Sequence, residues 1–231
     1  MGIQDELKKE AAHRAVEFIT SGMVIGLGTG STAKFAIERI GELLRSGSLK
    51  KISGIPSSDQ TEKLARQMAI PLTGLDVHPA VDLNIDGADE VDPDLNLIKG
   101  GGGALLKEKI IAQASRRNII IVDDSKLSAQ LGNLFALPVE IVPLARKTEE
   151  NYLQSLGASV TLRTDDDGQP FRTDQNNLIL DAELGPIADL NGLDHKLNQR
   201  AGIVEHGLFI ALADDVIVAG ENGIEHLKRK N

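Results

Sequence analysis

Two glycine-rich segments of this 231-residue chain have residue types suited to binding phosphate and stabilising negative charge. The first, Gly28-Thr29-Gly30-Ser31-Thr32, follows the apolar run Met23–Leu27 and precedes a segment with helical spacing. At a helix N-terminus the unpaired backbone N–H groups and the helix dipole attract an anion, and hydroxyl groups can donate to it. The pattern predicts a phosphate site; the alternative is a tight turn in which Ser31 is a plain helix cap.

The same segment also matches the dinucleotide-binding pattern G-x-G-x-x-A, with Ala33 in the last place. That interpretation requires an acidic residue at the end of the second strand. Instead, Ile55 is followed by Pro56-Ser57-Ser58. A nicotinamide-binding enzyme therefore remains an alternative, but the acidic residue that it requires is missing.

The second glycine-rich segment is Lys99-Gly100-Gly101-Gly102-Gly103. Four consecutive glycines cost conformational entropy on folding, so an ordered copy should serve a close approach of the backbone to a ligand. A flexible linker is the alternative, but a lysine precedes the loop and a predicted helix, 104–117, follows it. We expect the loop to bind substrate.

Glu108 is the residue of that helix best placed to act as a base. Residues adjacent on a helix point about 100° apart, so Lys107 and Lys109 point away on either side of it. Glu108 shares its face with small or apolar residues and one serine: Ala104, Ile111, Ala112 and Ser115. Partial desolvation there would raise its pKa toward that of a general base, whereas the alternative is a solvated charged stretch.

Two further polar clusters follow predicted strands. Asp86-Gly87-Ala88-Asp89-Glu90 comes after the strand 81–85, and Asp123-Asp124-Ser125-Lys126 after the strand 118–122. Taken alone, the first is equally well an acidic turn, and Lys126 is better explained as a helix-start lysine. Ligands of open α/β sheets bind at the carboxyl ends of the strands, so the convergence of these clusters with the glycine segments favours one site.

The elements that would position these residues alternate between strands and helices. Strands are expected at 23–27, 51–55, 81–85 and 118–122, which predicts an α/β fold with a mostly parallel, Rossmann-like sheet flanked by helices. From about residue 132 the pattern changes to that of a smaller inserted α+β domain, with strands at 137–142, 159–163 and 177–181. Segments 208–213 and 216–219 are expected to rejoin the first sheet. The predicted domains are a discontinuous catalytic domain, 1–131 plus 208–231, and the smaller domain, 132–207.

Composition restricts the function further. The net charge of −9 repels nucleic acid, and an aromatic content of 3% offers few stacking platforms for single strands. Cysteine is absent, which excludes a thiolate nucleophile and fits a reducing compartment. The five histidines are scattered, and no apolar stretch approaches the length of a membrane span. We expect a soluble, cytoplasmic protein that has neither a metal site nor a membrane or nucleic-acid partner.

Together, the two glycine segments, Ser58-Asp59, Asp86–Glu90, Lys107-Glu108-Lys109 and Asp123–Lys126 resemble the type A family of ribose-5-phosphate isomerases. Leu137-Pro138-Val139-Glu140 and Gly207-Leu208-Phe209 extend the resemblance over most of the chain. The resemblance implies a cofactor-free aldose–ketose isomerase of the pentose phosphate pathway. It interconverts D-ribose 5-phosphate and D-ribulose 5-phosphate as a homo-oligomer, with a dimer expected first and a tetramer as the alternative.

The resemblance also implies residue roles. Thr29, Gly30, Ser31 and Thr32 would hold the phosphate, and Glu108 would be the base. The sugar end would be bound by the segment Asp86, Gly87, Ala88 and Asp89, by Lys99 with Gly100, Gly101 and Gly102, and by Lys126. Asp86, Asp89 and Lys99 would take part in catalysis, and the sequence leaves open which aspartate helps to open the furanose ring.

Three competing functions remain from the residues alone. An amino-sugar phosphate deaminase or a lactonase would want a histidine near the acid, and no histidine lies inside a motif. A non-catalytic sugar-phosphate sensor would need an output domain for which 231 residues leave no room. A nicotinamide-dependent enzyme would need an acidic residue after Ile55, where the chain has Pro56.

Overall fold

The computed structural model describes residues 2–221 and 223–230, which form two compact units. The larger unit comprises Met1–Ala88, Lys107–Lys126 and Ala211–Asn231; the smaller comprises Asp89–Leu106 and Leu127–Ile210. The two units differ from the two predicted domains mainly in residues 89–106. These residues were predicted to lie in the catalytic domain but belong to the smaller unit. The segment Asp86–Glu90 therefore crosses from one unit to the other along the chain.

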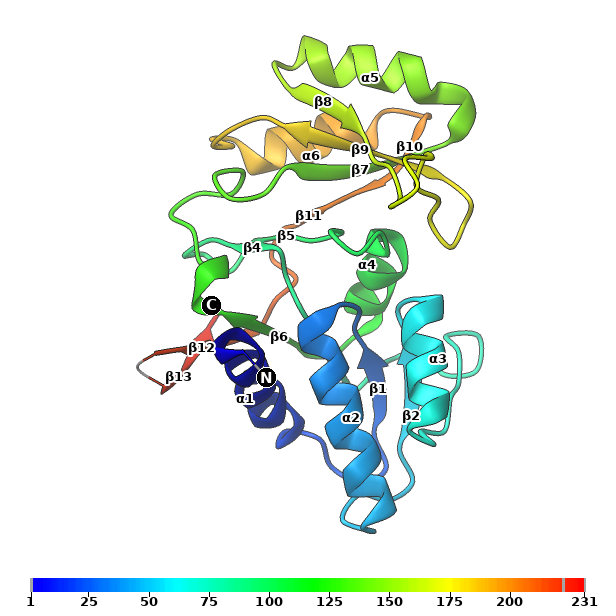
Figure 1. Ribbon diagram of the computed structural model, residues 1–231, viewed down its shortest axis with the longest axis vertical. Helices are drawn as coiled ribbons and strands as arrows, with labels where there is room; N and C mark the ends of the chain where they lie inside the picture. The colour runs from blue at the N-terminus through cyan, green and yellow to red at the C-terminus, as the bar shows by residue number, and fades with distance from the viewer. Residues whose placement is uncertain (1, 222, 231) are drawn as a thin grey trace. The chain divides into compact units, whose positions relative to one another are not determined.

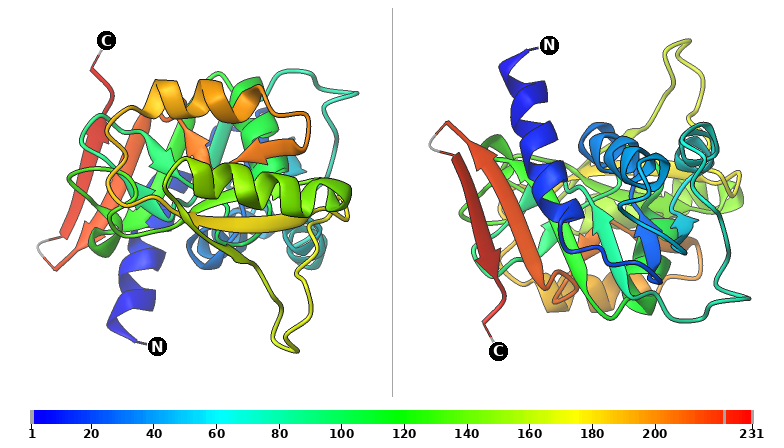
Figure 2. Two further views of the ribbon diagram at one scale, coloured as in Figure 1. Left: turned by 90° about the horizontal axis from the view of Figure 1, so that it is seen from above. Right: turned by 90° about the horizontal axis from the view of Figure 1, so that it is seen from below.

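A six-stranded, mostly parallel sheet forms the centre of the larger unit (Figures 1 and 2). Its order is β13 (Gly223–Lys228), β12 (Asp215–Gly220), β6 (Asn118–Asp123), β3 (Leu83–Asp86), β1 (Val24–Leu27) and β2 (Ser53–Pro56). All neighbours are parallel except β12 and β13, which form an antiparallel hairpin at one edge. The predicted α/β class is confirmed, although β13 was not expected.

Helices cover both faces of this sheet, which explains why its strands β1, β6 and β12 are largely apolar and buried. Ile25 and Leu27 of β1 point into a core shared with α1 (Ile3–Val16), α2 (Ser31–Arg45) and α3 (Asp59–Gln67). Gly26 points to the other face, where Ile111 of α4 (Leu105–Ala114) packs so closely that a Cβ on Gly26 would lie 2.7 Å from its Cγ2. Successive residues of β1 therefore face opposite helix layers.

The smaller unit contains an antiparallel sheet in the order β10 (Ile203–His206), β7 (Leu137–Ile141), β9 (Leu178–Glu183) and β8 (Ser159–Leu162). Alternate residues of β7 and β9 pack with Leu153 of α5 (Arg146–Ser155) and Leu197 of α6 (Leu190–Asn198). The period of two in β7 and β9 thus places the two helices on one face. Pro138 and Asp181, paired across β7 and β9, lie on the opposite face.

A second small sheet joins β11 (Leu208–Phe209), β5 (Leu97–Ile98) and β4 (Glu90–Val91) within the smaller unit. The expectation that segment 208–213 rejoins the first sheet is therefore wrong, because Leu208 and Phe209 pair with Ile98 and Leu97. The expectation for 216–219 is confirmed, since β12 pairs with β6. Strands of two residues carry too little periodicity to be recognised in a sequence.

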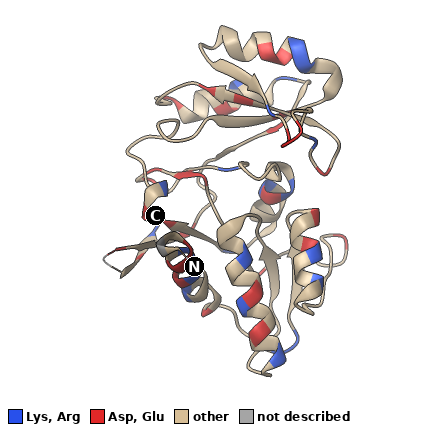
Figure 3. Cartoon of the chain, in the orientation of Figure 1, with Lys and Arg blue, Asp and Glu red and all other residues tan. Residues whose placement is uncertain are grey.

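No helix of the described residues is long and apolar enough to cross a membrane. Both α2 and α3 carry basic and acidic residues, coloured blue and red in Figure 3, as is usual for surface helices.

Candidate active site

The turn Gly28–Thr32 connects β1 to α2 and leaves the start of that helix uncovered. Gly30 is the N-cap at φ 105°, a conformation that favours glycine, and it has no side chain with which to cap the helix. The first intrahelical bond is donated by the Lys34 N–H to the Gly30 carbonyl oxygen, at 3.1 Å. The N–H groups of Ser31, Thr32 and Ala33 therefore have no intrahelical acceptor, which is the arrangement an anion requires.

Beside this helix end, a cleft of about 580 Å³ lies between α2 and α3. Gly28, Gly30 and Ser31 line one part of it. The remaining lining comes from lysine, amide, hydroxyl and aliphatic side chains: Lys34, Lys63, Gln60, Gln67, Thr61, Ile37 and Leu64. The two lysines were missed by the sequence reasoning, although Lys34 follows Gly30 by only one helical turn.

Asp86, the last residue of β3, packs directly against this turn. A Cβ on Gly28 would lie 2.2 Å from Asp86 Oδ1 and 2.5 Å from its Cα, so only glycine fits there. The same Oδ1 accepts the N–H of Thr29 at 3.0 Å and that of Gly87 at 2.8 Å. Asp86 is 1% exposed. The structure thus brings together two of the predicted motifs, which lie 57 residues apart.

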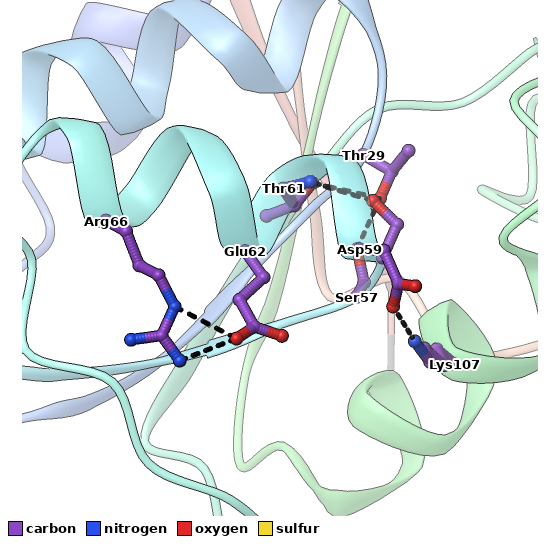
Figure 4. A network of polar contacts seen from close by, with 8 residues as sticks. Thr29, Ser57, Asp59, Thr61, Glu62, Arg66 and Lys107 are labelled. Carbon is purple, nitrogen blue, oxygen red and sulfur yellow. Dashed lines mark hydrogen bonds and ion pairs between the residues drawn. The ribbon is translucent and has the colours of Figure 1, made fainter. Parts of the chain in front are cut away.

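Thr29 is also the centre of a hydroxyl cluster, defined as Thr29, Ser57, Ser58 and Thr61. Figure 4 shows Thr29, Ser57 and Thr61 of this cluster. Thr29 Oγ1 lies 2.8 Å from the Oγ atoms of Ser57 and Ser58 and 3.2 Å from Thr61 Oγ1. Thr61 in turn donates to the Gly28 carbonyl oxygen at 2.9 Å, and Ser58 caps α3 by accepting the Thr61 N–H. The cluster ties the turn before α2 to the start of α3.

Glu108 lies in the first turn of α4 and is 4% exposed, so the solvated alternative is wrong for this residue. Ile111 and Ala112, which share its face, are buried as expected. Lys109 was expected to point away from the face that carries Glu108. It is nevertheless buried as well, at 6% exposed. Lys107 is partly exposed and donates to Asp59 Oδ1 at 2.8 Å (Figure 4). This ion pair links α4 to the N-terminus of α3.

Lys126 ends a short 3₁₀ turn, Asp124–Lys126, which follows β6 directly. Asp123 is 2% exposed and accepts the hydroxyl and the N–H of Ser125, which shapes the turn. The Lys126 side chain is half-buried at the carboxyl end of the central sheet. In the larger unit, β3 therefore ends at the predicted site residue Asp86, and β1 and β6 lead directly into the segments that hold Thr29 and Lys126.

The smaller unit carries the glycine loop, Gly100–Gly103, together with Asp89. Asp89 Oδ2 accepts the Gly101 N–H at 2.7 Å, and a Cβ on Gly101 would lie 2.5 Å from Asp89 Oδ1. Gly100 and Gly103 have φ values of 101° and 77°, and the Gly103 N–H donates to the Gly100 carbonyl oxygen at 2.9 Å. The four glycines form an ordered turn rather than a linker.

Lys99, immediately before the loop, is 3% exposed. Its N–H donates to the Gly207 carbonyl oxygen at 2.9 Å, and its Nζ lies 5.5 Å from the centre of the Phe209 ring. A cation over an aromatic face gains electrostatic stabilisation. Lys99 is thus a buried positive charge at the start of the glycine loop.

Glu90 is fully buried and has a structural role that was not predicted from the sequence. Its carboxylate accepts four backbone N–H groups, at 3.0 to 3.2 Å, from Gly132, Asn133, Leu134 and Phe135. Glu90 therefore anchors the loop that leads into β7.

Among the described residues, no group of three or more His, Cys, Asp or Glu side chains is placed to hold a metal ion.

Residues 53–223 match the model of the family described as ribose 5-phosphate isomerase A (phosphoriboisomerase A). Ribose-5-phosphate isomerase A of Desulfatibacillum aliphaticivorans is 58% identical over 228 residues, which cover 99% of each chain. The same enzyme of Chloroflexus aurantiacus is 58% identical over 95% of this chain and 92% of its own. A solved D-ribose-5-phosphate isomerase in complex with phospho-erythronic acid is 42% identical and superposes with a TM-score of 0.96, covering 99% and 100% of the two chains.

Proposed function

Because this chain belongs to the ribose-5-phosphate isomerase A family and interconverts ribose 5-phosphate and ribulose 5-phosphate, we propose that Glu108 is the base of that reaction. The observation that carries the assignment is a carboxylate only 4% exposed in the first turn of α4, directly after the glycine loop. A carboxylate withdrawn from water is a stronger base than a solvated one.

The reaction moves a carbonyl group from C1 to C2. Glu108 removes the C2 proton, and the electron pair of that bond forms a C1–C2 double bond while O1 takes the negative charge. The proton of the C2 hydroxyl then passes to O1, and Glu108 returns its proton to C1. The intermediate is a cis-enediolate, and a single carboxylate serves both transfers.

The enediolate needs fixed positive charge and donors close to its oxygens. Lys99 supplies a buried cation, and the backbone of Gly100, Gly101 and Gly102 approaches the substrate without side chains. A relative was solved with phospho-erythronic acid, a molecule that combines a phosphate with a planar carboxylate. That carboxylate resembles an enediolate in shape and charge, which supports an anionic intermediate here.

We assign the phosphate to the turn before α2, with Gly30, Ser31 and Thr32 facing it. The uncapped N–H groups of α2 support this assignment. Thr29 acts through the hydroxyl cluster and through its N–H bond to Asp86, which hold the turn in place. Asp86 and Asp89, with Gly87 and Ala88 between them, exchange hydroxyl protons at the sugar end and help to open the furanose ring, and Lys126 binds the sugar.

The first test mixes the protein with ribose 5-phosphate alone, in the presence of a metal chelator and without nucleotide, and follows ketose formation. We expect turnover, because proton transfer by side chains requires no redox group or Lewis acid. Absence of turnover in folded protein would overturn the proposed mechanism.

The second test is Glu108→Gln, which keeps size and shape but removes the base. We expect kcat to fall at least ~10²-fold, the usual loss for a positioned general base, with KM and the unfolding midpoint little changed. Glu62→Gln is the matched control, because Glu62 is a partly exposed carboxylate on α3 that forms an ion pair with Arg66 one helical turn away. Near-normal turnover in Glu108→Gln would refute the assignment.

We further propose a homo-oligomer, a dimer first and a tetramer as the alternative, in the cytoplasm. In the smaller unit, Leu144 is 99% exposed, and Val142 and Val204 are each more than one third exposed. Val142 donates to the Gly202 carbonyl oxygen, so these side chains lie in one region. Light scattering after size exclusion would measure the mass; a monomer at micromolar concentration would refute the proposal.

A further inference from the structure

Arg163, one residue beyond β8, binds backbone carbonyl groups of the glycine loop within the smaller unit. Its Nη1 donates to the carbonyl oxygens of Gly100, at 2.7 Å, and Gly101, at 3.1 Å. Its Nε donates to Asp181 Oδ2 at 2.9 Å, and its Nη2 donates to Asp181 Oδ1. The guanidinium side chain is only 14% exposed. One planar group therefore joins two loop carbonyls to a carboxylate of β9.

These contacts set the direction of the loop amides. In a planar trans peptide the C=O and the following N–H point in opposite directions. The Gly100 carbonyl turns toward Arg163, and the N–H of Gly101, in the same peptide unit, points to Asp89 Oδ2 at 2.7 Å. The Gly101 carbonyl is held in the same way, so the Gly102 N–H also points away from Arg163.

The rest of the loop rests on the sheet face opposite α5 and α6. A Cβ on Gly100 would lie 3.3 Å from Pro138 Cβ, and one on Gly103 would lie 2.5 Å from the Phe171 ring. Packing thus fixes where the loop lies, whereas Arg163 at the two carbonyls, together with Asp89 at the Gly101 N–H, fixes how its peptide planes are turned. Lysine cannot replace the planar fork that contacts both the carbonyls and the carboxylate.

We propose that Arg163, with Asp181 as its counter-ion, is a positioning residue for the isomerisation, which holds the Gly101 amide on Asp89 and orients the Gly102 amide. This role rests on the proposed function of the loop in supporting the enediolate. Asp181 balances the charge of Arg163, so Arg163 acts through geometry and Lys99 supplies the charge.

The test is Arg163→Lys, measured by steady-state kinetics with ribose 5-phosphate and with its C2-deuterated form. We expect kcat to fall about 10- to 100-fold, the scale of a displacement of roughly 1 Å at a reacting group, with KM changed less than about twofold. We also expect a larger deuterium isotope effect, because proton transfer becomes slower relative to binding and release. A merely structural role lowers the folded fraction and leaves the isotope effect unchanged.

Arg172→Lys is the matched control. Arg172 is an exposed arginine near Arg163 in the chain that donates to a backbone carbonyl, that of Asn176. We expect its kinetics to equal those of the unmodified protein. Asp181→Asn is a second variant, which keeps Arg163 and removes its counter-ion, and we expect it to change kcat and the isotope effect in the same direction by a smaller factor.

Unchanged kcat in folded Arg163→Lys would overturn the proposal. If Arg163→Lys does not fold, unchanged kcat and isotope effect in Asp181→Asn would overturn it instead. Glu108→Gln measured in parallel separates the two proposals: turnover in that variant refutes the base assignment, whereas the role of Arg163 is refuted only by its own variants and by Asp181→Asn.

Discussion

Glu90 offers a stability test that does not depend on the catalytic assignments. Each of its two carboxylate oxygens accepts two N–H groups of the loop 132–135. In Glu90→Gln an NH₂ group replaces one of the two carboxylate oxygens. This donor faces two backbone N–H donors, so those two N–H groups lose their acceptor. The side chain is fully buried, so no rotamer exposed to water relieves this conflict.

The magnitude follows from the two lost bonds. An unsatisfied buried donor costs about 1–3 kcal/mol, and the two bonds that remain lose their charge assistance. Asn133 and Leu134 are exposed, so water can reach part of the loop. We therefore expect Glu90→Gln to lower the free energy of unfolding by about 2–4 kcal/mol.

Urea denaturation measures this loss, and hydrogen exchange locates it. The amides of residues 132–135 should exchange faster, because they lose their acceptor. Glu183→Gln is the matched control, since Glu183 is an exposed carboxylate at the end of β9 and should change stability by less than about 0.5 kcal/mol. Equal stability of Glu90→Gln and the control would refute the reasoning.

Two further predictions concern the larger unit. Gly28→Ala places a Cβ 2.5 Å from the Asp86 backbone, so we expect a loss of about 1–3 kcal/mol in urea denaturation. The shifted turn should also lower kcat/KM at least ~10-fold, whereas Gly2→Ala, whose Cβ meets nothing within 4 Å, should match the parent; an active, stable Gly28→Ala would contradict this. Burial raises the pKa of Asp215, but hydrogen bonds from Arg117 and His226 outweigh burial and hold that pKa below its usual value. The stabilisation is present above the unfolded-state pKa of about 3.9 and is lost as pH falls through the lower folded-state pKa. Asp215→Asn should therefore cost about 1–2 kcal/mol at pH 7, and the difference in unfolding midpoint should shrink below about pH 4; a difference independent of pH would refute it.

Local patterns were sufficient for much of the fold and for the candidate residues. The apolar run before Gly28 and the helical spacing after it predicted β1, the turn and α2, because both depend on neighbouring residues. The burial of Glu108 followed from the arc it shares with Ile111 and Ala112. The alternation of strands and helices predicted the parallel sheet, because this order can also be recognised from neighbouring residues.

Contacts between distant segments could not be predicted in this way. Asp86 reaches Thr29 across 57 residues, and Arg163 reaches Gly100 across 63. Glu90 looked like one more acid of an active-site cluster, yet its carboxylate holds a loop more than forty residues further along the chain. The periodicity of apolar residues indicates which face of a helix or strand is buried. The order of the strands and the packing of the loops decide which partner contacts that face. Both exist only once the chain has folded.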